Sequence, residues 1–138
     1  MTSSVRVITK KMKLLLLVLA VAAMVPLARS THSVRIRGRL LCYGKPLYSH
    51  LVHVYEHNFL FPDVQTVEAL TDTQGYVDVS ATGGESFIIE SAPYLYVRHD
   101  CPGRCDTLQV VIPDYYVNRG HLPRRVFNFG DLEIANNC

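Results

Sequence analysis

The four cysteines and six histidines carry the most reactive side chains of this 138-residue chain. Cys42, Cys101, Cys105 and Cys138 form an even set, which predicts two disulfides in a short chain that is exported. Four cysteines allow three pairings, and the sequence leaves the choice open. We favour Cys101–Cys105 with Cys42–Cys138, which would tie the first strand to the C-terminus. A zinc site is disfavoured because Cys101 and Cys105 lack a second close pair at zinc-finger spacing.

Three histidines, His50, His53 and His57, have a spacing that suggests a metal site. On a strand, however, the α-carbons of His53 and His57 lie about 13 Å apart. One ion cannot bridge that distance without ligands from other strands, and His50 points to the opposite face from His53. We therefore expect no metal ion and no cofactor, and outward histidines that confer pH sensitivity if they function at all.

A possible nucleophile is found where His99, Asp100 and Cys101 are adjacent. A catalytic thiolate requires a free cysteine, whereas an exported chain with four cysteines is expected to pair them all. The sequence therefore predicts no catalytic residue.

An arginine row is the first candidate for a binding surface. Arg35, Arg37 and Arg39 alternate with apolar residues, so on a strand they share one face at intervals of about 6.6 Å. Such a row suits an acidic partner or lipid phosphates. The alternative is a solvated strand face whose arginines pair with Asp or Glu on a neighbouring strand.

Aromatic residues in expected loops are the second candidate. They would suit contact with a protein or a lipid, although core packing is the alternative for the phenylalanines. The residues are Tyr43, Tyr48, Phe59 and Phe61.

The first thirty residues have the pattern of a cleaved signal peptide. Four basic residues lie between Arg6 and Lys13, and an apolar run of 12 residues follows from Leu14 to Val25. That run is too short for a membrane span of about twenty residues but typical of a signal peptide. Small residues at Ala28 and Ser30 predict cleavage after Ser30. Met12 is an alternative start of the same leader.

Removal of residues 1–30 leaves a domain of 108 residues, 31–138, with no expected transmembrane segment. Its nine Lys and Arg against 12 Asp and Glu give a formal charge of −3, so the basic character of the chain belongs to the leader. A mildly acidic domain of this size argues against a nucleic-acid partner and predicts a single core. We expect a monomer or a small homo-oligomer.

Alternation with a period of two dominates the mature chain, and no stretch sustains a helical apolar period. Short strands separated by Gly, Pro and Asp predict an all-β, two-sheet sandwich of about seven strands, with one helical turn near Pro113–Tyr116. The expected strands are Val34–Cys42, Leu51–His57, Gln65–Leu70, Tyr76–Ser80, Phe87–Glu90, Tyr94–His99, Leu108–Ile112 and Val126–Ile134.

An ordered set of short motifs resembles the nematode transthyretin-like family. The motifs lie at Gly38–Pro46, Val52–Glu56, Thr71–Val77, Pro93–Cys101, Val111–Val117 and Asp131–Ile134. The resemblance covers nearly all of residues 34–138. It implies a secreted domain of the transthyretin-like (prealbumin-like) fold, and it implies little about activity. Departures from the family pattern fall in loops, at the single mature lysine Lys45 and at Phe59 and Phe61.

These observations together predict a secreted, non-enzymatic, extracellular binding protein whose partner is a protein or a lipid. Enzymes of this fold hydrolyse 5-hydroxyisourate with His and Arg side chains and a Tyr-Arg-Gly-Ser-like C-terminal tail, whereas this chain ends in Ile134–Cys138. A hydrolase is therefore one alternative, disfavoured by the missing tail. A carrier of small apolar ligands is the other, and it would need a cavity or a channel between subunits.

Overall fold

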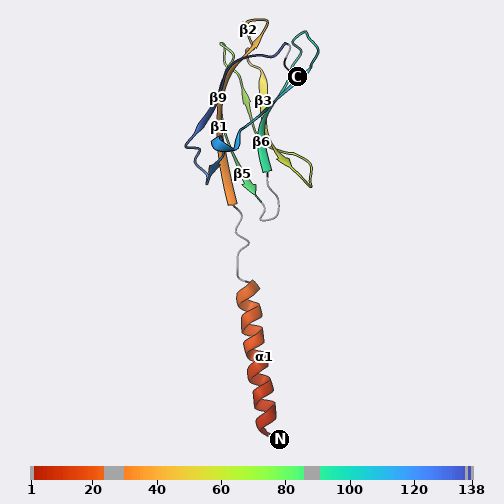
Figure 1. Cartoon of the computed structure of the whole chain (residues 1–138), viewed down its shortest axis with the longest axis vertical. Coiled ribbons are helices and arrows are strands. Elements are labelled where there is room, and N and C mark those ends of the chain that lie inside the picture. Colours follow the sequence, from red (N-terminus) through yellow and green to blue (C-terminus); the bar gives the residue numbers. More distant parts are fainter. Residues whose placement is uncertain (1, 24–29, 86–90, 136, 138) are drawn as a thin grey trace.

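Residues from Ser30 onward build two β-sheets that pack face to face. The computed structural model describes residues 2–23, 30–85, 91–135 and 137 of the chain. Figure 1 shows the two layers of the sandwich and the separate helix α1, Thr2–Ala23. The expected two-sheet β-sandwich is confirmed.

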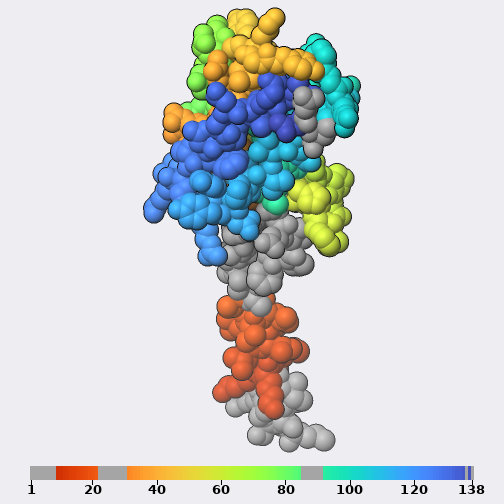
Figure 2. All heavy atoms as spheres, turned by 45° about the horizontal axis from the view of Figure 1, so that its top comes forward, coloured from red at the N-terminus to blue at the C-terminus, as the bar shows by residue number. Residues whose placement is uncertain are grey.

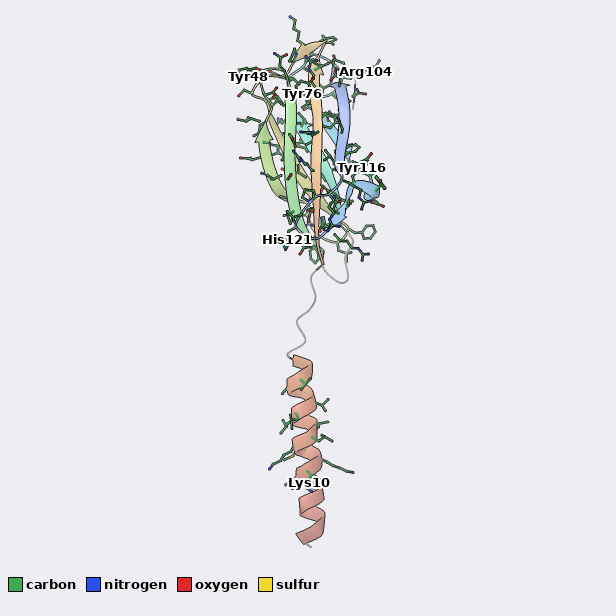
Figure 3. The ribbon with its side chains drawn as sticks, turned by 90° about the vertical axis from the view of Figure 1, so that its left-hand side faces the viewer. Lys10, Tyr48, Tyr76, Arg104, Tyr116 and His121 are labelled. Carbon is green, nitrogen blue, oxygen red and sulfur yellow. A yellow bond between two sulfur atoms is a disulfide. The ribbon has the colours of Figure 1, made fainter. Side chains whose placement is uncertain are left out.

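Sheet A is organised around the long strand β1, Ser30–Cys42. An antiparallel partner, β5 (Tyr76–Glu85), lies on one side of it, and a parallel partner, β9 (Val126–Glu133), lies on the other. Two short strands, β2 (Lys45–Pro46) and β8 (Asn118–Arg119), pair with the two ends of β1. Figure 3 looks onto this sheet, with β1 between β5 and β9.

Sheet B is antiparallel throughout and has the strand order β4-β3-β6-β7. Its central strands are β3, Leu51–Asn58, and β6, Ser91–Arg98. The edge strands are β4, Val64–Leu70, and β7, Thr107–Val111. A 3-10 turn, Asp114–Tyr116, follows β7 and confirms the expected helical turn.

The core lies between the sheets because every second residue of each strand points inward. Its fully buried members come from both layers. They include Val34, Ile36, Leu40, Val52, Val54, Leu95, Val97, Ile112 and Ile134. Because the even-numbered residues of β1 and β3 point into the core, their odd-numbered residues lie on the outer faces of the two sheets.

A buried polar pair joins the sheets at one end of this core. His32 Nε2 on β1 lies 2.7 Å from Glu56 Oε1 on β3, and their side chains are 6% and 9% exposed. Gly83, opposite His32 on β5, makes room for the pair, because a Cβ at this position would overlap the Glu56 carboxylate. A pair this close offsets part of the cost of burying a carboxylate.

The strand predictions hold, but several strands are longer than predicted: β1 begins at Ser30 rather than Val34, and β6 begins at Ser91 rather than Tyr94. Seven strands of five or more residues occur in the described residues, in agreement with the expected number. β5 does not end at Ser80 as predicted but continues through Ala81–Gly84, because β1 begins at Ser30 and pairs with it there. The expected strand at Phe87–Glu90 lies outside the described residues.

The disulfide pairing that we favoured from sequence is wrong. Cys42 is bonded to Cys101, whose α-carbon lies 5.9 Å from that of Cys42. This bond links the end of β1 in sheet A to the segment that follows β6 in sheet B. Cys105 is also disulfide-bonded, and its partner cannot be Cys101, because Cys101 is bonded to Cys42. Cys138 lies outside the described residues.

Helix α1 lies within the expected leader, and the large apolar side chains described on it are exposed. Leu14, Leu17 and Val21 each expose about three fifths of their surface. In the described residues, no helix meets the length and apolarity that a membrane crossing requires.

Candidate functional site

Strand β1 positions the three arginines on the outer face of sheet A, as predicted. Their even-numbered neighbours Val34 and Ile36 are buried, so the odd-numbered side chains face solvent. The side chains of Arg35, Arg37 and Arg39 are 40%, 53% and 24% exposed. We call these three residues the arginine row.

Asp78 of β5 pairs with two members of the row. Its carboxylate accepts hydrogen bonds from Arg35 Nε and Nη2, each at 2.9 Å, and from Arg37 Nε at 2.9 Å. These bonds, that of Arg35 first, lower the pKa of Asp78 to about 2, and they raise the pKa of Arg35. One carboxylate thus serves two guanidinium groups, and the cluster keeps a net positive charge.

Arg39 is held by three other groups. Its Nε donates to the carbonyl oxygen of Gln74 at 2.8 Å, and its Nη1 lies 3.7 Å from Asp131 Oδ2. The guanidinium carbon also lies 5.4 Å from the centre of the Tyr76 ring. Arg39 is therefore the most fixed of the three arginines, and Arg37 is the most exposed.

A β-bulge in β9 opens a groove beside Arg37. Arg37 pairs with Asn128 and Arg39 with Asp131, so two residues of β9 lie opposite Gly38. Gly130 has a positive φ of 70°, and its amide donates to Asn128 Oδ1 at 2.9 Å. Such a bulge bends a strand and re-aims its side chains.

The groove encloses about 480 Å³. Its lining combines one exposed cation with carboxylates, an amide and an exposed tyrosine. The residues are Arg37, Gly38, Tyr76, Val77, Asp78, Asn128, Gly130 and Asp131. Figure 3 shows Tyr76 near the upper end of this face. We call this site the β1–β9 groove.

Sequence reasoning found Arg37 but missed the rest of the groove. The available signal was Asn128-Phe129-Gly130-Asp131, since a glycine inside a strand often marks a bulge. Asp78 carries no comparable signal, because its partners lie more than forty residues earlier in the chain.

The aromatic loop residues do not form one site. Tyr43 and Tyr48 flank β2, and the Tyr43 hydroxyl donates to the carbonyl of Pro102 at 2.7 Å. Phe59 and Phe61 lie beyond the other end of the eight-residue strand β3. In Figures 1 and 2 the loop after β3, in yellow-green, projects away from the end that carries β2. Phe59 is 84% exposed, so core packing is excluded for it.

The outer face of sheet B carries a cluster of rings that we call the tyrosine layer: His53, Tyr55, Tyr94 and Tyr96. Tyr55 and Tyr94 stack with their centres 5.7 Å apart, and Tyr96 meets Tyr55 edge-on at 5.8 Å. The Tyr94 hydroxyl donates to Asp63 Oδ2 at 2.6 Å, and His57 Nδ1 lies 2.8 Å from Asp63 Oδ1. Burial and the Asp63 contact raise the pKa of Tyr94 to about 12.

The histidines are distributed over different environments. His53 points outward and lies 3.8 Å from Glu68, whereas His50 Nε2 lies 2.7 Å from the carbonyl of Arg98. His99 is buried beyond β6, and its neighbour Cys101 belongs to the disulfide. Among the described residues, no three His, Cys, Asp or Glu side chains are placed to hold a metal ion.

Comparison with known proteins agrees with this architecture. A model of the transthyretin-like family matches residues 37–113. Transthyretin-like protein 5 of Caenorhabditis elegans is 32% identical over 128 residues, covering 90% of this chain and 91% of that protein. Transthyretin-like protein 2 of the same organism is 33% identical over 115 residues, covering 76% of each chain. The chain therefore belongs to the transthyretin-like family.

Proposed function

We propose that the chain is secreted after loss of its leader and that the mature domain is a non-enzymatic extracellular binding protein. The basic residues before the apolar run support removal of residues 1–30. The Cys42–Cys101 bond and the bonded Cys105 support an oxidising destination, because disulfides persist outside the cytosol.

The β1–β9 groove is the surface that we assign to binding, and it carries the proposal. Arg37 is half exposed there, and Asp78 is shared between Arg37 and Arg35. A guanidinium group has five donors in a planar fork, so Arg37 keeps the capacity to bind a carboxylate, sulfate or phosphate of a partner.

Secretion is tested on the protein released by cells that express the full chain. N-terminal sequencing should begin at or within a few residues of Thr31. A product that retains Leu14–Val25 and sediments with membranes would contradict the proposal.

Binding is tested by capture of extracellular partners with the purified mature domain. We expect Arg35→Gln/Arg37→Gln/Arg39→Gln to lose capture that the parent domain shows at low salt. The matched control, Lys45→Gln/Arg98→Gln/Arg104→Gln, removes the same charge at exposed positions outside the groove. If both triple variants lose capture equally, the loss reflects the change in net charge and not the groove. If the arginine-row variant retains capture, the assigned surface is refuted.

The proposal that the domain is not an enzyme is tested with 5-hydroxyisourate, the substrate of the enzymes of this fold. His53 lies among the rings of the tyrosine layer on the outer face of β3, whereas His99 is buried beyond β6, so the two imidazoles lie in separate environments. We expect no hydrolysis above background. Turnover that falls in His53→Ala or His99→Ala would establish an enzyme instead.

A further inference from the structure

Basic residues of the mature domain are concentrated on sheet A. Six of its nine Lys and Arg lie either in the arginine row or in the segment 119–125, which runs from the last residue of β8 to the start of β9. That segment contains Arg119, His121, Arg124 and Arg125, and no acidic residue occurs from 115 to 130. We call it the basic loop. The positive charge is local, because the domain as a whole is acidic.

The basic loop lies at the start of β1, next to the arginine row. Arg119 pairs with His32, and Val126, the residue after the loop, pairs with Arg35. Figure 3 places His121 at the lower end of sheet A, opposite to Tyr76. The arginine row therefore runs along β1 from the loop towards the β1–β9 groove, in the direction of the strand.

The loop is held in place before any partner binds. Asn118 is buried, its Nδ2 donates to the carbonyl of Tyr116 at 2.9 Å, and its Oδ1 accepts from the Arg125 amide at 3.1 Å. The Gly120 amide donates to the Thr31 carbonyl at 2.7 Å. The Arg125 guanidinium lies 4.7 Å from the centre of the Tyr115 ring. A preorganised loop loses less conformational entropy when it binds.

From this arrangement we infer that the arginine row and the basic loop together bind a sulfated polysaccharide of the extracellular space. The proposal rests on the proposed function and names the partner class. Arginines at intervals of about 6.6 Å along a strand match a linear chain that repeats its anionic groups. Guanidinium groups bind sulfate in the planar, bidentate manner that they use for phosphate.

The groove lining favours a sugar over a protein. Asn128, Asp131 and Tyr76 offer an amide, a carboxylate and a ring to hydroxyl-bearing rings. Protein interfaces are instead depleted of Asp and Glu, whereas this groove is lined by Asp78 and Asp131. The exposed apolar side chains Phe59 and Phe61 belong to the loop after β3, outside the groove.

The test uses heparin as the probe and the purified mature domain, titrated at low and at physiological salt. We expect saturable binding that weakens as salt rises, because exposed charges are screened beyond about 8 Å at physiological ionic strength. Heparin stripped of its sulfates should bind at least about tenfold more weakly, since exposed ion pairs carry the affinity. Equal binding of stripped heparin, or of single-stranded DNA of matched charge, would overturn the assignment to sulfated sugar.

Two variants locate the surface. Arg124→Gln/Arg125→Gln should weaken heparin binding by about tenfold, whereas Arg98→Gln/Arg104→Gln, with the same charge loss, should change it by no more than about twofold. Equal effects of the two variants would refute the loop's role. Arg124 and Arg125 lie outside the groove. If their variant loses heparin binding but still captures the extracellular partner, that partner is not a sulfated polysaccharide. This inference then fails while the proposed function stands.

A third variant predicts an effect of the opposite sign. Asp78→Asn removes the carboxylate that holds Arg35 and Arg37, and it should tighten heparin binding severalfold. The charge-matched control is Glu68→Gln, an exposed carboxylate on sheet B, which should leave the affinity within about twofold. Weaker binding by Asp78→Asn, with an unchanged thermal melt, would show that the arginines do not contact the ligand.

Discussion

The outer faces of the two sheets differ in how far their polar groups are used within the domain. On sheet B, the hydroxyl of Tyr94 and the ring of His57 both contact Asp63, and the rings of the tyrosine layer pack on one another. On sheet A, Arg35 and Arg37 share the single carboxylate of Asp78. The polar groups of sheet B are thus paired within the domain, whereas sheet A has two guanidinium groups for one carboxylate and can bind a further anion.

This difference separates stability from binding. Packed rings that exclude water contribute to folding, whereas an exposed ion pair contributes about 1 kcal/mol or less. We therefore expect substitutions on sheet B to change the free energy of unfolding and substitutions on sheet A to change affinity.

The largest effect should come from the bond that joins the two sheets. Replacing Cys42 and Cys101 together by Ala removes a crosslink across 59 residues, and loop-closure entropy predicts a loss of about 4 kcal/mol in the free energy of unfolding. Urea denaturation of both proteins under non-reducing conditions measures it. A loss below about 1 kcal/mol would mean that the sheets hold together by packing alone.

The next effect distinguishes the two faces directly. Tyr94→Ala should cost about 3 kcal/mol, because the ring is 8% exposed and stacks on Tyr55. Arg37→Ala, the matched truncation on sheet A, should stay within about 0.5 kcal/mol. Chemical denaturation of the two variants gives both values. Similar losses would remove the contrast between the faces.

A smaller effect isolates the polar contact from the packing of the ring. Tyr94→Phe keeps the stacking but removes the donor to Asp63, and it should cost about 1 kcal/mol. Tyr96→Phe, on the same face, is the control, because its contacts to Tyr55 and His53 are made through the ring. If both variants lose the same stability, the Asp63 contact has no special role.

The pH dependence of unfolding provides the last comparison, with one limb for each face. The pKa of Asp78 is about 2 in the folded protein against an ordinary 3.8, so its contribution is present above pH 3.8 and lost as the pH falls towards 2. The pKa of Tyr94 is about 12 against an ordinary 10.0, so its contribution is lost as the pH rises through that window.

Thermal melts across pH 2–5 and pH 9–12 would test the two limbs. Asp78→Asn should flatten the acid limb and leave the alkaline limb unchanged. Tyr94→Phe should flatten the alkaline limb and also part of the acid limb, because the bond from the Tyr94 hydroxyl is the main cause that lowers the pKa of Asp63. An unchanged slope in either variant would show that the group titrates alike in the folded and unfolded chain.

The alternation of apolar and polar residues determined most of the fold and part of the site. Val34, Ile36 and Leu40 at even positions of β1 require that Arg35, Arg37 and Arg39 face outward, whichever strands lie beside them. The same reasoning located β3, β6 and β9 within a few residues. It also predicted the outward histidines of β3.

Tertiary structure decided the partners of these residues. Asp78 reaches Arg35 because β5 pairs with β1 across more than forty residues, and Cys42 meets Cys101 because the two sheets close over one core. The β1–β9 groove depends on a bulge in a strand that pairs in parallel with the first one. Whether a strand residue faces the core follows from the alternation of apolar and polar residues in its own segment, so burial can be predicted from the sequence. Pairing depends on the register between segments distant in the chain, which is set only when the whole core packs.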